Sequence, residues 1–284
     1  MSRFNDLSLV LRRMCSMFSG VVGLAIVAVI IASALFAPWI ATHAPDQLDI
    51  LNRFALPSAE HWLGTDHLGR DLFSRLVHGS SVAMAVALTA IGLALTTGTV
   101  LGTLAGFLPP RSERFVLILF DIISSFPSLV LALAVVAVFG PSASMVILVV
   151  TVTLTPHFGR VARAQVLSLK NAPFLEAERI IGASRARIVV YHILPNILGS
   201  LIVLASMDIP VVISIEAGLS FLGLGVRPPL ASWGVLIQDG YQFLSESWIP
   251  VVTASAALAV ATLGFTLFGE ALRDAVDPRL RGEG

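Results

Sequence analysis

The sequence predicts an all-α membrane protein with six transmembrane helices and both termini in the cytoplasm. Of its 284 residues, 56% are hydrophobic and only 13% are charged, and the mean hydropathy is +0.88. A chain of this composition is too apolar for a soluble domain. Six apolar runs long enough to span a bilayer alternate with polar segments, and the basic residues gather in every second segment.

The N-terminal tail is basic and precedes the first apolar run. Arg3, Arg12 and Arg13 stand before a charge-free stretch at residues 18–41, and such residues hold a tail in the cytoplasm. A cleaved signal peptide is the alternative, but the run is too long for the apolar core of such a peptide and no cleavage motif ends it cleanly. Residues 1–41 are therefore predicted to form a tail and a first membrane helix that points outward.

Residues 42–80 are predicted to be an extracytoplasmic segment with an amphipathic helix on the membrane surface. Thr65 or Asp66 is positioned as a helix cap, and apolar residues follow along one helical face. These apolar residues are Leu68, Leu72, Phe73 and Leu76. His61 and His67 invite comparison with a metal site, but their spacing and that of Asp66 match no ligand pattern. They are interpreted as caps and interfacial contacts.

Residues 81–270 are predicted to hold the other five membrane helices. Their approximate ranges are 82–108, 115–139, 145–159, 197–219 and 248–269. The first of these carries glycines, mostly at four-residue steps, which allow another helix to approach closely. The glycines are Gly92, Gly98, Gly102 and Gly106.

Prolines and tryptophans add detail to this core. Pro127 is expected to break the helix at Phe126, and Pro156 to kink the next helix. Trp233 and Trp248 flank an outer loop and are expected at the membrane interface. The charged residues 271–284 are expected to form a cytoplasmic tail.

Three acidic residues fall inside predicted spans, where an unpaired charge is costly. Asp121 lies two helical turns from Arg114, so an ion pair or a helix-end contact is favoured over contact with a transported solute. Asp208 and Glu216 are spaced to share one face of a helix. That face either lines a watery path or has its charges paired inside the bundle.

The counts of basic residues support this topology. All but four of the 18 basic residues fall in segments assigned to the cytoplasmic side. The exceptions are Arg53, Arg70, Arg75 and Arg227. Because cytoplasmic segments of membrane proteins carry an excess of Lys and Arg, six spans with both termini inside satisfy the rule, and the reverse orientation violates it.

A polar island, residues 175–196, interrupts the apolar runs. Basic residues in or just before it place it in the cytoplasm. They are Arg163, Lys170, Arg179, Arg185 and Arg187. Glu176 is spaced for an i,i+3 ion pair with Arg179, Gly182 divides two short helical pieces, and Pro195 begins a new helix. Helices this short are not stable alone, so residues 171–194 are predicted to dock on another protein.

Five residues of the island form a spaced pattern. An acidic residue is followed directly by a small one, then by a glycine five positions later, and finally by a Leu-Pro pair. The five residues are Glu176, Ala177, Gly182, Leu194 and Pro195. The pattern resembles the coupling motif of permease subunits in binding-protein-dependent ABC importers. Glu178 departs from the motif, which prefers a small residue there, and His192 stands where isoleucine is common.

Further stretches narrow the resemblance to one branch. The sequences HILPN, LGTDHLGRD and SFLGLGVRPP are similar to the dipeptide, oligopeptide and nickel importers, in the subunit type with an amphipathic helix after its first span. The resemblance implies a type I ABC importer permease fold in the bacterial inner membrane. It also implies that the chain forms half of a translocation pathway for peptides. The alternative is that the transported solute is nickel or another small solute.

The resemblance also supplies partners and residue roles. The partners are a homologous second permease, two ATP-binding subunits, an extracytoplasmic solute-binding protein and membrane lipid. Gly182 would provide a bend, Glu176 a polar anchor, and Ile180 and Ile181 an apolar contact. The whole ATPase-coupling surface would comprise Glu176, Ala177, Ile180, Ile181, Gly182, Ala183, Leu194 and Pro195.

The chain carries no motif for chemistry of its own. Its one lysine, Lys170, follows Leu169, so the Gly-Lys-Ser/Thr sequence of a phosphate-binding loop is absent. ATP and Mg²⁺ are therefore expected on the partner subunits, with no cofactor, catalytic residue or metal ligand in this chain. A membrane enzyme finds no support in the spacing of His, Glu or Ser. A self-sufficient secondary transporter or channel remains the alternative class, and it would work without ATP.

Two other observations limit the function. The net charge is zero and no basic patch with interleaved aromatic residues occurs, so a nucleic-acid partner is excluded. The single cysteine, Cys15, cannot form a disulfide within the chain.

Overall fold

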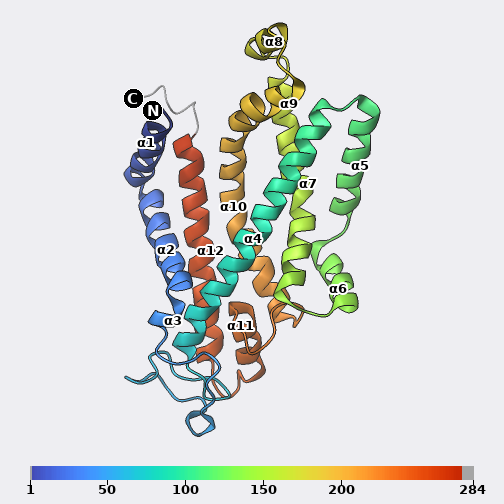
Figure 1. Cartoon of the computed structure of the whole chain (residues 1–284). Helices are drawn as coiled ribbons and strands as arrows, with labels where there is room; N and C mark the ends of the chain where they lie inside the picture. Colours follow the sequence, from blue (N-terminus) through green and yellow to red (C-terminus); the bar gives the residue numbers. More distant parts are fainter. Residues whose placement is uncertain (1, 277–284) are drawn as a thin grey trace.

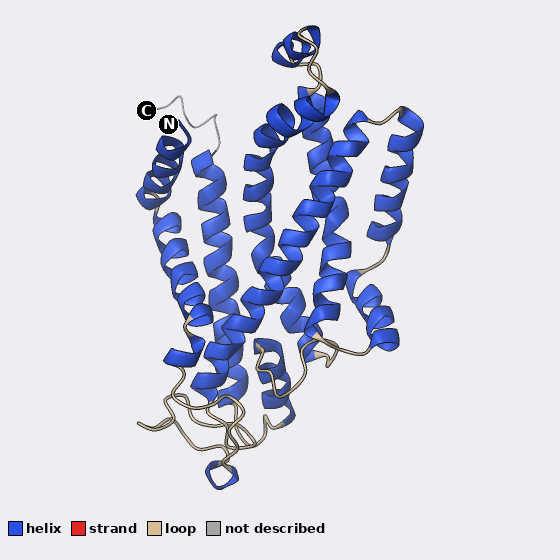
Figure 2. Ribbon diagram, viewed as in Figure 1, coloured by secondary structure: helices blue, strands red, loops and turns tan. Residues whose placement is uncertain are grey.

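Five long helices form the body of the molecule. The computed structural model describes residues 2–276, and in that range its regular elements are helices (Figures 1 and 2). The long helices are α2 (Phe18–Leu35), α4 (Leu72–Phe107), α7 (Ala143–Leu169), α10 (Leu194–Phe221) and α12 (Ile249–Val276). All five are long and apolar enough to cross a membrane, which confirms the predicted all-α membrane class.

The short helices lie at the two ends of this body (Figure 1). One end carries α1 (Ser2–Ser16) together with a projection formed by α8 (Pro173–Ile180) and α9 (Arg185–Arg187). The other end carries α3 (Ala37–Ile40), the loop that follows it and α11 (Trp233–Gln242). The N-terminal helix and the predicted docking island therefore share one end of the molecule, as the predicted topology requires.

Part of the expected C-terminal tail continues a membrane helix. Residues up to Val276 extend α12, and Ala271 and Ala275 bury their side chains against Met14 of α1. Residues 277–284, the rest of the expected tail, lie outside the described residues. The contact joins α1 to the C-terminal turns of α12.

The predicted span at 115–139 is bent. It consists of α5 (Pro110–Ser125) and α6 (Ser128–Phe139), whose axes differ in direction by 85°. The break falls at Phe126 and Pro127 as predicted, because the residue before a proline avoids the helical conformation, and Phe126 has φ −89° and ψ 125°. The predicted break is confirmed, its angle was not predicted, and the described residues contain six spans if the bent pair counts as one.

Glycines allow α4 and α7 to pack closely. A Cβ atom added at Gly98, Gly102 or Gly106 would overlap atoms of α7, and at Gly102 the clash is with the backbone of Gly159. Gly92 differs, since no atom lies within 4 Å of its added Cβ. The predicted role in close packing is thus confirmed for three of the four glycines.

The outer segment does not contain the expected surface helix. Between residues 42 and 71 the chain is loop except for one 3₁₀ turn, η1 (Ile50–Asn52), and α4 begins at Leu72. Of the residues expected on the apolar face of the surface helix, Leu72, Phe73 and Leu76 lie instead in the first turns of a membrane-spanning helix, and Leu68 lies in the loop before it. The amphipathic helix predicted within residues 42–80 was therefore wrong.

The backbone conformation of two glycines and the hydrogen bonds of one aspartate explain why this segment is a loop and not the expected helix. Gly64 and Gly69 adopt φ values of 78° and 73°, which do not occur within a helix. The carboxylate of Asp66 accepts hydrogen bonds from two backbone N–H groups that follow it, forming a turn that competes with the helix. The cap of α4 is Asp71, five residues later than predicted.

Buried ion pairs hold the loop against α11. Arg70 donates to Asp66 at 2.7 Å and to Asp239 of α11 at 3.1 Å. Arg75, with a side chain only 1% exposed, lies 3.6 Å from the Asp66 carboxylate and 3.5 Å from that of Asp239. Two arginines thus share two carboxylates, so each buried charge has an opposite charge beside it.

The buried carboxylate of Asp71 accepts a second set of hydrogen bonds in this loop. Burial by itself would raise the pKa of the Asp71 carboxyl, but hydrogen bonds from the side chain and backbone of Ser74 and from His61 hold its pKa below the usual value. Asp71 is therefore a carboxylate at neutral pH and serves as a hydrogen-bond acceptor.

The second outer loop contains α11 and separates the two tryptophans into different environments, one buried and one exposed. Trp233 is 3% exposed, and its indole N–H donates to the Leu76 carbonyl of α4 at 3.0 Å. Its expected interfacial position was wrong, because the indole N–H satisfies a carbonyl inside the protein. Trp248 is 63% exposed at the start of α12, as an interfacial residue would be.

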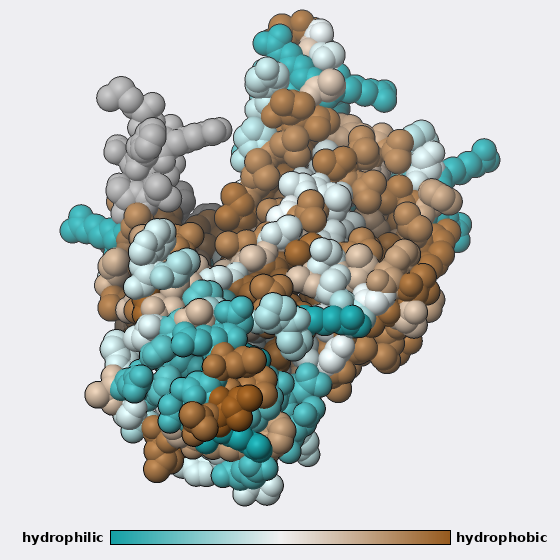
Figure 3. Space-filling model, turned by 60° about the horizontal axis from the view of Figure 1, so that its bottom comes forward, coloured by the Kyte–Doolittle hydropathy of each residue, from teal (hydrophilic) through white to brown (hydrophobic). Residues whose placement is uncertain are grey.

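The molecular surface follows the same division. Seen towards the loop end, hydrophilic side chains gather on that end, whereas hydrophobic side chains cover the flank of the bundle (Figure 3). This arrangement is typical of a bundle whose flanks contact lipid or another apolar protein.

Candidate docking site

Helix α8 stands on the projection beyond the long helices (Figure 1). Pro173 occupies its first turn, where no N–H is needed, Glu176 lies in the first turn and Arg179 in the last. Both charges interact favourably with the helix dipole. Leu175 is fully buried at 0% exposure. One leucine therefore anchors α8, while most of its other residues face outward.

The ion pair expected between Glu176 and Arg179 is not formed. The Arg179 guanidinium instead donates to the carbonyl of Lys170, the C-cap residue of α7, at 2.9 Å. Among the described residues, no hydrogen bond or ion pair engages the side chain of Glu176. Arg179 binds the Lys170 carbonyl and not Glu176, because carbonyls at a helix end lack intrahelical partners and are free to accept.

Gly182 forms the bend after α8. Its φ is 88°, and the N–H groups of Gly182 and Ala183 donate to the carbonyls of Arg179 and Glu178. This pair of bonds is the Schellman motif, which ends a helix on a residue in the left-handed conformation. The predicted break at Gly182 is confirmed, and its cause is backbone conformation, because the space around its added Cβ is open.

A π-helical segment joins α9 to α10. Ser184 caps α9, residues 188–193 form the π-helix η2 (Ile188–Ile193), and α10 starts at Leu194. Pro195 explains the wider turn, since it has no N–H to donate and its ring would crowd a carbonyl one turn earlier. The new helix start predicted at Pro195 was wrong, because the helix runs without a break from Arg185 to Phe221, and the π-helix within it was not predicted.

The projection is anchored by a few buried side chains. Ile188 and Ile193 are 2% and 0% exposed, and Ala183 and Leu194 pack on the main apolar core. At its tip, Ile180 and Ile181 are 87% and 82% exposed. Glu176, Ala177 and Pro195 are exposed as well. The predicted coupling residues thus form one connected element with a bare apolar tip.

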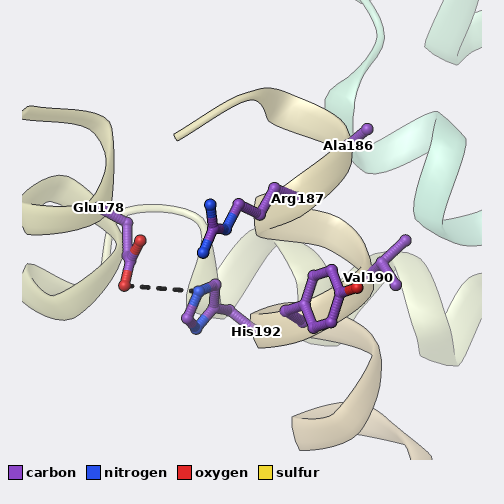
Figure 4. Close-up of a pocket in the computed structure, with 6 residues that line it drawn as sticks. Glu178, Ala186, Arg187, Val190 and His192 are labelled. Carbon is purple, nitrogen blue, oxygen red and sulfur yellow. Dashed lines mark ion pairs between the residues drawn. The ribbon is translucent and has the colours of Figure 1, made fainter. Parts of the chain in front are cut away.

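The two departures from the coupling motif lie opposite each other. Nε2 of His192 is 3.5 Å from a carboxylate oxygen of Glu178 (Figure 4). Both side chains line an open cavity of about 720 Å³ at the base of the projection, together with Arg187 and Tyr191. Each unusual residue has the other as its partner, a contact that spacing along the sequence did not reveal.

Two charged pairs lie on the flank of α7. Arg160 donates to Asp121 of α5 at 2.9 Å, and Nε2 of His157 lies 3.7 Å from a carboxylate oxygen of Asp208 in α10. The Asp121 side chain is 70% exposed. Asp121 therefore has an arginine partner, but it is Arg160 and not the expected Arg114.

Glu216 has a different environment from Asp208. It is fully buried, and its carboxylate accepts a hydrogen bond from Ser220 at 2.7 Å. The Ser220 hydroxyl also accepts from the backbone N–H of Val226, which fixes the start of the outer loop. Asp208 and Glu216 thus have separate partners inside the chain.

Comparison with protein families identifies the chain. Residues 98–282 match the binding-protein-dependent transport system inner membrane component, and residues 7–57 match the N-terminal transmembrane domain of oligopeptide transport permease C. The chain belongs to this family of ABC importer permeases. The permease is accordingly a multi-pass protein of the bacterial inner membrane.

Curated relatives agree with the family. The permease is 38% identical over 258 residues to the probable D,D-dipeptide transport system permease protein DdpC of Escherichia coli K12, covering 91% of this chain and 87% of the relative. It is 38% identical to the dipeptide transport system permease protein DppC of Alkalihalophilus pseudofirmus, with 92% and 86% covered. It is also 37% identical to the nickel transport system permease protein NikC of E. coli K12, with 90% and 93% covered. The predicted dipeptide, oligopeptide and nickel branch is confirmed.

Solved structures confirm the fold. The permease matches a chain of the inward-facing MetNI methionine ABC transporter with a TM-score of 0.59 and 20% identity, covering 72% of the permease and 98% of that chain. A second crystal form of the same transporter gives a TM-score of 0.57. The predicted type I importer permease fold is thus confirmed.

Proposed function

We propose that this permease forms half of the translocation pathway of an ATP-driven peptide importer, and that the projection of α8 and α9 docks on an ATP-binding subunit. The observation that carries the docking proposal is the exposure of Ile180 and Ile181, at 87% and 82%, on the tip of the projection. The family to which the chain belongs supports it.

Covering the two exposed isoleucines with a partner protein would be energetically favourable. Burying an isoleucine side chain contributes about 1.5–3 kcal/mol, and two adjacent ones at a tip form a compact anchor of the kind that dominates protein interfaces. Glu176 is exposed on α8 as well and supplies a polar group beside this apolar surface. The tip lies at the end with α1, which the charge distribution assigns to the cytoplasm.

The projection can transmit movement to the membrane helices. Leu175, Ile188 and Ile193 tie it to the bundle, and it lies between α7 and α10 in the chain. When the ATP-binding subunits close on ATP and Mg²⁺, the projection moves as a rigid lever and tilts both helices. Gly182 sets the angle of α8 on this lever.

A polar flank supports the pathway proposal. Asp121, Arg160 and His157 are exposed along α5 and α7, with Asp208 beside them. Charged groups at membrane depth are costly against lipid, so this flank faces the second permease subunit or the watery pathway between the two. An extracytoplasmic solute-binding protein would deliver the solute to the opposite, loop end.

Peptides are the preferred solute, and nickel is the second candidate. The flank offers both charge signs, which suits the two charged termini of a short peptide. The dipeptide permeases among the relatives support peptides, whereas the nickel permease relative, at 37% identity, supports nickel. Copurification of the solute-binding protein with its ligand distinguishes the two.

Cysteine cross-linking tests the docking proposal directly. A Cys15→Ser background removes the only cysteine, after which Ile180→Cys is introduced and the importer is treated with a short thiol-to-amine reagent. An adduct between the permease and an ATP-binding subunit is expected. Leu51→Cys is the matched control, since Leu51 is 98% exposed but lies in the loop at the other end. Equal adducts from both variants, or none from Ile180→Cys, would contradict the docking.

Reconstitution separates an importer subunit from a secondary transporter. The lone permease in vesicles is expected to give no uptake, and uptake is expected only when ATP-binding subunits, second permease, binding protein and ATP are all present. Flux through the lone chain without ATP would instead support a self-sufficient transporter or channel.

A further inference from the structure

A cluster of ligating side chains lies at the loop end, far from the projection. His43, Glu60 and His61 each offer one ligand atom, and these atoms all lie within 4.8 Å of one another. Ligand atoms around one ion bonded at about 2.0–2.2 Å lie roughly 3–4 Å apart, so a small inward movement of the three side chains would complete the geometry. We propose that these three residues form a site for a divalent transition-metal ion, of which Zn²⁺ and Ni²⁺ are the best matches.

Both imidazole rings are fixed by a contact at Nδ1. Nδ1 of His61 lies 2.9 Å from the Asp71 carboxylate, and Nδ1 of His43 lies 3.0 Å from the Thr42 hydroxyl. That hydroxyl in turn donates to the other oxygen of Asp71 at 3.3 Å. In this chain of bonds both Nδ1 atoms are donors, and each Nε2 keeps its lone pair.

This arrangement is the support usual for metal-bound histidine. A carboxylate or hydroxyl beyond the ligand fixes the ring and raises its basicity. Among the described residues, no hydrogen bond or ion pair engages Nε2 of His43 or His61. Asp71 is completely buried and also caps α4, so it is a fixed point for both rings.

The site is open to an entering ion. A small cavity of about 50 Å³ is lined by the three ligands, Asp71 and nearby loop residues, and a cavity of roughly 10–15 Å³ already holds one water. His61 is buried, His43 is partly exposed and Glu60 is exposed. Three protein ligands leave a coordination position for water, so the ion is exchangeable.

The donor set selects the class of metal. Two imidazole nitrogens and one carboxylate suit Zn²⁺, Ni²⁺ and their neighbours, whereas Ca²⁺ and Mg²⁺ prefer oxygen ligands alone. The affinity for Mg²⁺ is therefore expected to be negligible beside that for Zn²⁺.

A second group in the same region lacks this chemistry. Asp66, His67 and Asp239 also lie within reach of one ion. Both carboxylates, however, are already engaged by Arg70 and Arg75 at 2.7–3.6 Å. A cation would have to displace an arginine, so this group serves as an internal control.

Metal binding to the purified, tag-free permease tests the site. The protein is dialysed against ZnCl₂ or NiCl₂, and bound metal is measured by elemental analysis and titration calorimetry. One ion per chain is expected. Glu60→Gln, at an exposed position, is expected to weaken binding by at least about 10–100-fold, the loss usual for removing a mere outer-shell partner, as is His43→Ala. His67→Ala is expected to bind as the unmodified protein does.

The outcomes are decisive in either direction. Stoichiometric binding lost in Glu60→Gln and in His43→Ala but kept in His67→Ala supports the site. No binding by the unmodified protein, or equal loss in all three variants, overturns it. The measurement does not depend on which solute is transported, so it stands apart from the proposed import function.

Discussion

The two ends of the permease differ in how they treat their charged and apolar side chains. At the loop end, Arg70 and Arg75 bury their charges against Asp66 and Asp239, and Asp239 lies 169 residues from Arg70 along the chain. At the projection, two isoleucines stand in solvent and the bend depends on the single residue Gly182. The loop end pairs its buried arginines with carboxylates of the same chain, whereas the projection presents the exposed apolar surface that we propose another protein covers.

This contrast separates effects on stability from effects on function. Substitutions at the loop end remove contacts within the chain, so they should change the free energy of unfolding. Substitutions at the projection remove contacts with a partner, so they should change coupling and leave unfolding nearly unaltered. Four predictions test the contrast, beginning with the largest expected effect.

Arg70→Met should destabilise the loop end by about 3–5 kcal/mol, because it leaves Asp66 buried with only the more distant Arg75. The free energy of unfolding in mixed detergent micelles is the measurement. Arg53→Met is the control, since its ion pair with Glu246 is exposed and should contribute less than about 1 kcal/mol. Equal losses would show that burial does not set the strength of these pairs.

Gly102→Val should destabilise the bundle that connects the two ends by about 1–3 kcal/mol, because the new side chain meets the α7 backbone at Gly159. Gly92→Val, in the same helix with open space beside it, should change stability by less than about 0.5 kcal/mol. Both are measured by the same unfolding assay. A similar loss in the two variants would argue against close packing of α4 on α7.

Gly182→Val should reduce uptake by roughly tenfold or more while insertion and unfolding stay normal. A β-branched residue in the left-handed region costs about 1–2 kcal/mol, which favours a different angle for α8. Gly182→Asn is the control, since asparagine tolerates this conformation and should retain most uptake. Uptake at the unmodified level in Gly182→Val, with normal assembly, would refute the lever.

The pair of Glu178 and His192 should give the smallest effect. The two side chains are 33% and 28% exposed at 3.5 Å, so a double-mutant cycle with Glu178→Gln and His192→Gln should yield a coupling energy below about 1 kcal/mol. The cycle is measured on unfolding and on ATPase activity of the assembled importer. A coupling energy of several kcal/mol would mean that the projection is braced as strongly as the loop end.

The fold was largely predictable because the membrane imposes simple rules. Hydropathy located each of the five long helices, although α4 begins ten residues before its predicted span and α7 ends ten residues after its own, and Pro127 located the break between α5 and α6. The break at Gly182 was predictable too, since a glycine between two helical patterns favours the left-handed conformation. The angle between α5 and α6 depends on packing, which no local pattern records, and the π-helix before Pro195 was not predicted although Pro195 accounts for it.

The loop end was poorly predictable because its contacts span long distances in the sequence. The indole of Trp233 reaches Leu76, 157 residues away, and Thr42 reaches Asp71 across 29. Spacing along the chain therefore gave a surface helix and no metal site, although His43 and His61 meet in the fold. For the projection, motif likeness named the residues, but their assignment to an ATPase contact stays a prediction until partners are tested.

The bend between α5 and α6 has a consequence for the surrounding lipid. Helices of 16 and 12 residues are only about 24 and 18 Å long, whereas the hydrocarbon layer is about 30 Å thick. With an 85° turn between them, neither piece matches the bilayer, and a solitary chain must thin the membrane on this side. If the proposed second permease subunit covers this side, it relieves the mismatch, and a thicker membrane is then expected to favour pairing of the two halves.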